Sequence, residues 1–88
     1  MPSFLVETYL ARRNASERPA RERRARRAAD ELTQEGTRVR FEHVIHVPED
    51  EICFFVFNAP SALAAALTAE RAGLGAWRVV KAISSGEE

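Results

Sequence analysis

The feature that most limits the fold is a short apolar run at residues 52–57, which reads Ile-Cys-Phe-Phe-Val-Phe. Both faces of any strand formed here are apolar, because the run contains no polar position. It is too short for a membrane span, which needs about 18 apolar residues, and its β-branched and aromatic content favours a strand. We therefore expect an interior strand of a sheet, covered on both faces.

Three other segments have the composition of strands, namely residues 3–10, 38–47 and 77–83. Residues 38–47 alternate closely, so we expect two distinct faces in this strand. One face comprises Val39, Phe41, His43, Ile45 and Val47, and the other comprises Arg38, Arg40, Glu42, Val44 and His46.

The turn composition of residues 48–51 predicts a hairpin between the segments 38–47 and 52–57. With Glu49 and Asp50 at its tip, the hairpin pairs residue 47 with residue 52. This register places His43 opposite Val56.

Two segments have helical patterns. Residues 12–35 are rich in Arg, Ala and Glu, with Ser16 as a candidate N-cap, Pro19 in the first turn and Gly36 as the stop signal. The apolar side of this helix comprises Ala25, Ala28, Ala29 and Leu32. The second helix is expected at residues 61–72, where helical spacing relates Leu63, Ala66, Leu67 and Glu70. Residues 84–88 are predicted to be a polar tail.

The order of elements is βαββαβ, which predicts an α+β fold of the ferredoxin-like, split-βαβ type in one domain over residues 1–88. Right-handed crossovers put both helices on one face of a four-stranded antiparallel sheet. The other face keeps apolar side chains without a cover, which is unfavourable for a monomer. We expect two copies to pack sheet to sheet as a homodimer, and an enclosed small-molecule ligand is the alternative.

Charge and cysteine content limit the partners and the location. Thirteen Lys+Arg balance thirteen Asp+Glu, so we expect no nucleic-acid partner, and we interpret the arginines at 18–27 as a solvated helix face. The alternative interpretation of these arginines is RNA binding, but the aromatic motif of RNA-recognition modules is absent from the sequence.

The cysteine content and the apolar segments indicate the location. A single cysteine, Cys53, excludes an intrachain disulfide, and no stretch resembles a signal peptide or a membrane span. We expect a cytoplasmic protein.

The candidate chemistry centres on one histidine. His43 and His46 are three residues apart on a strand and point to opposite faces, so they do not bind one ion within a chain. His43 combined with Glu7 and Tyr9 of the first strand gives imidazole and oxygen donors suited to nickel, copper or zinc. Two strand spacings, about 10 Å, separate Glu7 from His43, so we expect any metal near a dimer contact that supplies ligands from both copies.

Motifs for catalysis are absent from the sequence, which has neither a nucleophile elbow nor a Gly-rich phosphate loop. Cys53 lies inside the apolar run, where packing is its expected role. We therefore expect a binding protein and not an enzyme.

Four segments together resemble a known family: residues 1–10 (MPSFLVETYL), 47–54 (VPEDEICF), 59–61 (APS) and 70–74 (ERAGL). The chain resembles the nickel-binding, ferredoxin-like small proteins of actinobacterial type, a domain of formerly unknown function. The resemblance implies a cytoplasmic homodimer that binds nickel or a similar divalent ion, with no established reaction. Glu42 and His43 are similar to a Glu-His pair on the second strand of relatives, and Glu7 with Tyr9 matches their first strand. Thr68 stands where relatives carry a further histidine.

We therefore predict a homodimer that binds a divalent transition metal, nickel first, with His43 as the central ligand and Glu7 and Tyr9 in support. One alternative is a small-molecule enzyme or ligand carrier that uses the space between two sheets, as cofactor-free dimeric α+β barrels do. Another is a pure interaction module, for which we expect a dry, flat contact between the sheets.

Overall fold

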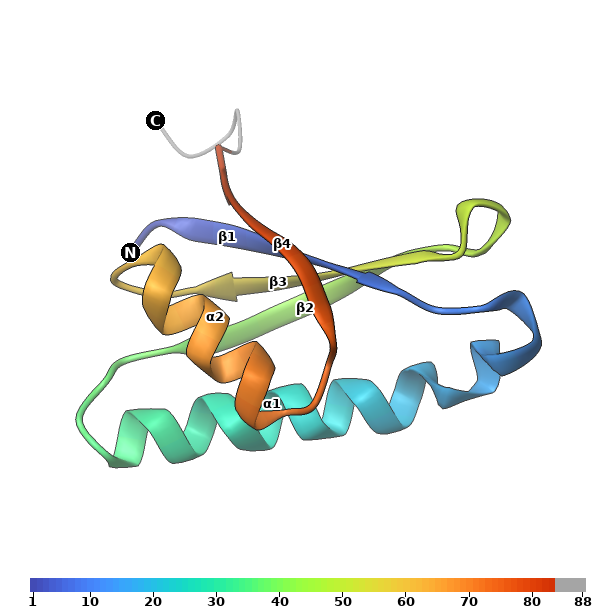
Figure 1. The fold of residues 1–88 in the computed structure, drawn as a ribbon. Coiled ribbons are helices and arrows are strands. Elements are labelled where there is room, and N and C mark those ends of the chain that lie inside the picture. The colour runs from blue at the N-terminus through green and yellow to red at the C-terminus, as the bar shows by residue number, and fades with distance from the viewer. Residues whose placement is uncertain (84–88) are drawn as a thin grey trace.

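The computed structural model describes residues 1–83, which form two layers, with both helices on one face of a sheet (Figure 1). The elements are β1 (Ser3–Tyr9), η1 (Arg12–Glu17), α1 (Arg18–Gln34), β2 (Arg40–Val47), η2 (Pro48–Asp50), β3 (Ile52–Asn58), α2 (Ala62–Arg71) and β4 (Ala76–Ala82). The four strands are antiparallel in the order β2-β3-β1-β4, so the predicted ferredoxin-like fold is confirmed. The predicted polar tail at 84–88 lies outside the described residues.

The core lies between the sheet and the two helices. Helix α1 buries the predicted stripe of Ala25, Ala28, Ala29 and Leu32. Small side chains on this stripe let the helix backbone approach the buried aromatic rings of the sheet, Phe55 and Phe57. Helix α2 buries Ala64, Ala65, Thr68 and Ala69, whereas Leu63 and Leu67 remain exposed on its outer side. Among residues 1–83, no helix has the length and apolar character needed to cross a membrane.

The start of the first helix differs from the prediction, because Ser16 is not its N-cap. Residues 12–17 form the separate 3₁₀ helix η1, and α1 begins at Arg18 with Pro19 in its first turn. A helix continued back through Pro19 would place the proline ring against the carbonyl of Ala15, so the regular helix has to begin near the proline. The N-cap position, Glu17, makes no side-chain capping hydrogen bond.

The hairpin between β2 and β3 has the predicted register. Its tip contains the turn η2, and Glu51 closes it in the left-handed conformation with φ 56°. The pairs are Val47 with Ile52, Ile45 with Phe54, and His43 with Val56.

A β-bulge interrupts the register between Phe41 and His43. Phe41 pairs with Phe57 and is buried in the core, whereas His43 lies on the opposite face of the sheet. The prediction that Phe41 and His43 share a face is therefore wrong, because a bulge inserts one residue and reverses the alternation. Beyond the bulge, Val44 packs on the core and His43 and Ile45 face away from it.

Candidate functional site

We call the side of the sheet that the helices leave uncovered the open face (Figure 1). The strand pairings show that its side chains are largely apolar. Its central side chains are Leu5, His43, Ile45, Val47, Ile52, Phe54, Val56 and Val80, with Glu7, Tyr9 and Arg78 among them. Ile45 is 44% exposed and Tyr9 is also 44% exposed. The open face thus presents partly exposed apolar side chains on adjacent strands.

The bulge in β2 brings Glu42 and His43, which are neighbours in sequence, to the same open face. His43 pairs with Val56, an open-face position of β3. The Glu42 carboxylate reaches Asn58, another open-face position, whose Nδ2 donates a 2.5 Å hydrogen bond to Glu42 Oε2. Adjacent residues of a regular strand point to opposite faces, so this convergence depends on the bulge.

A polar network holds the Glu42 carboxylate in place. Arg40 Nε donates to the same Oε2 atom at 2.5 Å, and Ser3 Oγ donates to Asn58 Oδ1 at 2.8 Å. Both hydrogen bonds to Glu42 end on Oε2, so Oε1 has no hydrogen-bond partner among residues 1–83. The imidazole of His43 is exposed and also has no hydrogen-bond partner among residues 1–83. One carboxylate oxygen and one imidazole are therefore free to bind a ligand.

These groups line a depression of about 350 Å³ at one end of the open face. Its polar lining comprises Ser3, Arg40, Glu42, His43 and Asn58, and its apolar lining comprises Leu5, Ile45, Val56, Ala82 and Ile83. Apolar walls with a few convergent polar groups are the usual composition of a ligand site.

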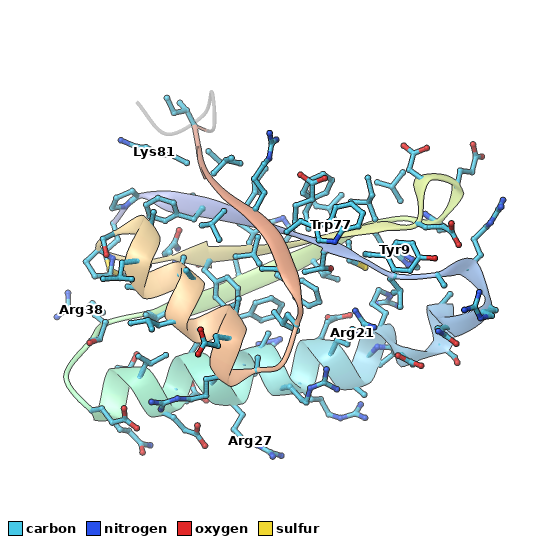
Figure 2. The ribbon with its side chains drawn as sticks, viewed as in Figure 1. Tyr9, Arg21, Arg27, Arg38, Trp77 and Lys81 are labelled. Atoms are coloured by element: carbon cyan, nitrogen blue, oxygen red, sulfur yellow. The ribbon has the colours of Figure 1, made fainter. Side chains whose placement is uncertain are left out.

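Glu7 and Tyr9 lie on the open face as expected, but each contacts β4 and not His43. Arg78 Nε lies 3.3 Å from Glu7 Oε1. Tyr9 stacks on Trp77, and the two rings lie side by side in Figure 2. Strand β3 separates β1 from β2, so one chain does not bring Glu7 or Tyr9 together with His43.

The donor set of one chain is incomplete for a metal. Within residues 1–83 there is no group of three His, Cys, Asp or Glu side chains placed to hold one ion. Thr68 is buried and donates through Oγ1 to the carbonyl of Ala64 at 2.8 Å. One chain offers the pair Glu42 and His43, so a complete site needs donors from elsewhere.

The second histidine and the cysteine lie on the core side of the sheet. His46 pairs with Cys53, and its Nε2 atom is buried without a hydrogen-bond partner in the described part of the chain. Burial raises the pKa of the Cys53 thiol, with weaker effects of Arg21, Arg18 and Glu22. A buried thiol with a raised pKa is a poor nucleophile.

The sequence prediction did not include Ser3, Arg40 and Asn58 in the site, and it placed Glu42 on the face opposite His43. One signal for the bulge is present in the sequence. Phe41 and Val44 are both apolar and lie three positions apart. Residues three apart on a regular strand point to opposite faces, so both side chains can face the core only if a bulge adds one residue between them.

No protein-family model matches the chain, and no curated protein matches it in sequence. Among solved structures, the crystal structure of SCO4226 from Streptomyces coelicolor A3(2) is similar, with a TM-score of 0.70 and 20% sequence identity. The match covers 94% of this chain and 98% of that one. At this level of identity the similarity establishes the fold alone.

Proposed function

We propose that the protein is a cytoplasmic homodimer that binds a divalent transition-metal ion, nickel first, at the His43 end of the open face. The observation that carries the proposal is the convergence of Glu42 and His43 in one depression, with free donor atoms on both side chains. Imidazole nitrogen and carboxylate oxygen suit nickel, copper and zinc. The resemblance of the sequence to a nickel-binding family supports the choice of ion.

The apolar open face supports the homodimer. Phe54 and Ile45 form a cross-strand pair on this face, and a second copy would remove such groups from water. Pairing through the sheet edges is disfavoured, because both edge strands take part in bulges, at Phe41/His43 on β2 and beside Glu7/Thr8 on β4. A face-to-face dimer with two-fold symmetry is therefore the arrangement we propose.

A second open face also supplies the missing donors. We propose that Glu7 and Tyr9 act as supporting ligands across the dimer, each reaching the Glu42–His43 pair of the opposite copy. Metal binding and dimerisation are then coupled, because a ligand set shared between copies binds only the assembled state.

The oligomeric state has a matched pair of test variants. Ile45→Glu places a charge on the open face, and Leu67→Glu places one on the outer side of α2, where Leu67 is 46% exposed against 44% for Ile45. Sedimentation is expected to give dimers for the wild type and Leu67→Glu, and monomers for Ile45→Glu. Wild-type protein that is monomeric at all accessible concentrations overturns the dimer.

The metal site is tested by calorimetric titration of apo-protein with nickel and zinc. His43→Ala and Glu42→Gln are expected to lose most of the binding heat. Glu49→Gln, which changes an exposed carboxylate in the hairpin turn, is expected to bind as the wild type does. If the wild type and His43→Ala release equal heat on binding the metal, His43 is not a ligand and the proposed site is wrong.

A ligand carrier is the second candidate, favoured by the apolar walls of the depression. On this hypothesis a small amphipathic molecule lies between the two sheets, with its polar end at Arg40 and Asn58. Binding of a medium-chain carboxylate to metal-free wild-type protein, lost in Ile45→Glu and kept in His43→Ala, would support the carrier over the metal site.

A further inference from the structure

The charges of the chain are segregated, although their total is zero. Residues 12–27 contain eight arginines against two glutamates, a net charge of +6, and the rest of the chain therefore carries −6. This segment comprises η1 and the first part of α1. About a fifth of the chain therefore carries a net charge of +6, although the net charge of the whole chain is zero.

The two glutamates of the segment are already paired within it. Glu17 pairs with Arg21, and Glu22 pairs with Arg18. The six other arginines form no ion pair with a carboxylate in residues 1–83; they are Arg12, Arg13, Arg23, Arg24, Arg26 and Arg27. We call these six residues the arginine surface.

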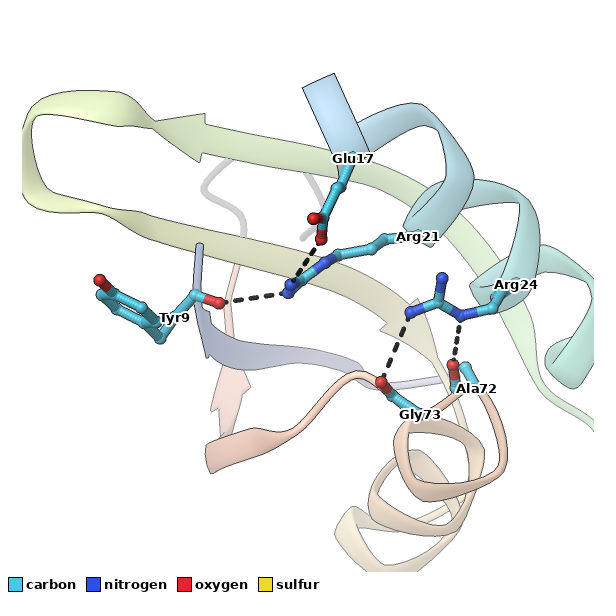
Figure 3. A network of polar contacts seen from close by, with 6 residues as sticks. All are labelled: Tyr9, Glu17, Arg21, Arg24, Ala72 and Gly73. Atoms are coloured by element: carbon cyan, nitrogen blue, oxygen red, sulfur yellow. Dashed lines mark hydrogen bonds and ion pairs between the residues drawn. The ribbon is translucent and has the colours of Figure 1, made fainter. Parts of the chain in front are cut away.

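Two of the six make other contacts that leave their charge uncompensated. Arg24 Nε donates to the carbonyl of Ala72 at 2.8 Å, and the same guanidinium reaches Gly73 (Figure 3). The Arg26 guanidinium lies 5.0 Å from the centroid of the Phe41 ring. These contacts orient two guanidinium groups and neutralise neither.

The arginine surface lies on the outer side of α1, where Arg23 and Arg27 are directed away from the core and Arg24 and Arg26 lie at the two margins. The four arginines of α1 within it are all exposed, and the buried stripe of α1 begins between them at Ala25. At about 100° per residue, the four arginines centre on the side of the helix opposite that stripe. Figure 2 shows Arg27 extending from α1 away from the sheet. Arg12 and Arg13, which are also exposed, extend the surface along η1.

The order of charges along α1 opposes the helix dipole. The helix has no acidic residue in its first turn and no basic residue in its last turn. Arginines gather towards its N-terminal half, and Asp30 and Glu31 lie near its C-terminal end. Cations near a helix N-terminus are unfavourable for helix stability, so helix formation does not explain this arrangement. The positive end of the dipole instead adds to the field of the arginines.

We propose that the arginine surface binds the phosphate backbone of double-stranded nucleic acid without reading the bases. The α-helical part of the segment, residues 18–27, is about 15 Å long, which spans about four base pairs at 3.4 Å each, and η1 precedes it with a kink at Asn14. A long and regular polyanion matches six dispersed guanidinium groups better than a compact anion does. The acidic parts of the chain beyond about 10 Å are screened at ordinary salt, so the neutral total does not prevent local binding.

The test is fluorescence anisotropy of a labelled 20-base-pair duplex titrated with full-length protein at 50 to 200 mM salt. Six phosphate contacts predict a slope of log Kobs against log salt of about −5. The variant carrying Arg23→Gln, Arg26→Gln and Arg27→Gln is expected to bind at least tenfold more weakly, with the slope reduced by about 3. Duplexes of unrelated sequence are expected to bind equally.

The matched control removes the same charge elsewhere. The variant carrying Arg38→Gln, Arg78→Gln and Lys81→Gln removes three exposed positive charges that lie outside residues 12–27, and it is expected to bind within twofold of the wild type. Circular dichroism confirms the fold of each variant. Three results overturn the proposal: no binding at 50 mM salt, equal losses in the two triple variants, or tighter binding of an acidic peptide than of the duplex.

Discussion

The rings of Tyr9 and Trp77 stack with their centroids 6.0 Å apart and their planes inclined by 20°. Tyr9 occupies the end of β1, and Trp77 lies where a register shift interrupts the pairing of β4 with β1. A bulge re-aims the side chain of the extra residue, which explains how Trp77 reaches the ring on the neighbouring strand. Trp77 remains 62% exposed, so the stacked pair presents an aromatic surface to solvent.

Trp77 therefore reports on the proposed dimer, because it is the single tryptophan of the chain. We expect its emission to shift to shorter wavelength as protein concentration rises, since a second open face would remove the indole from water. Ile45→Glu is expected to keep the long-wavelength emission at every concentration. A constant emission maximum across a dimerisation seen by sedimentation would place Trp77 outside the interface.

Ser16, two residues before α1, and Ser61, the N-cap of α2, are expected to differ in their effect on stability. Ser61 caps α2, where its Oγ accepts a 3.1 Å hydrogen bond from the backbone N–H of Ala64. Ser61→Ala is expected to lower the free energy of unfolding by about 1 kcal/mol. Ser16→Ala is expected to change it by less than about 0.5 kcal/mol, because Ser16 is exposed and caps no helix. Urea unfolding of both variants measures the difference, and equal losses would contradict the assignment of the caps.

The fold is predictable from local patterns that each act over a few residues. The stripe from Ala25 to Leu32 needs only helical spacing, and the pairing of His43 with Val56 needs only the length of the turn between two strands. The Ser16 prediction fails because capping depends on where the regular helix can begin, and Pro19 moves that point to Arg18.

The candidate site is less predictable, because its geometry depends on contacts between strands. The direction of Glu42 is set by the bulge and by Asn58 on the neighbouring strand, and a strict alternation assigns Glu42 to the wrong face. The partner of Glu7 is Arg78 on β4, more than 70 residues away in the sequence. Such pairs follow from the register of the whole sheet and not from any local pattern.

Cys53 is expected to resist thiol reagents in the folded protein. The side chain is fully buried, and burial raises the pKa of its thiol, so little thiolate forms and no reagent reaches it. The rate of reaction with a chromogenic disulfide is expected to follow the rate of global unfolding and to rise steeply in denaturant. Fast labelling under native conditions, without loss of circular dichroism, would show that β3 opens locally.

The contact between Glu35 and Arg71 is expected to make stability depend on pH in the acid range. Arg71 donates to both carboxylate oxygens of Glu35, at 2.7 and 2.9 Å, and these hydrogen bonds lower the pKa of Glu35 below its ordinary value of 4.5. A carboxyl group with a lowered pKa stabilises the folded state above about pH 4.5, and this contribution is lost as the pH falls through the folded-state pKa.

The measurement for this pair compares the melting temperatures of the wild type and Glu35→Gln. The wild type is expected to melt higher at pH 7, and the difference is expected to shrink progressively as the pH falls below 4.5. Glu49→Gln is the control, because Glu49 is an exposed carboxylate in the turn η2. A difference that persists at the lowest pH would assign the effect to packing and not to charge.

Arg40 is expected to compete with the proposed metal ion for Glu42. Its guanidinium donates to Glu42 Oε2 at 2.5 Å, and its side chain is 72% exposed, so an ion binding there meets a neighbouring positive charge. Arg40→Gln removes that charge and is expected to tighten nickel binding by about threefold to tenfold at low salt, with a smaller gain at high salt. Arg23→Gln makes the same change of charge on α1 and is expected to leave the affinity unchanged. Weaker nickel binding by Arg40→Gln than by the wild type would mean that the guanidinium positions Glu42 for the ion and does not oppose it.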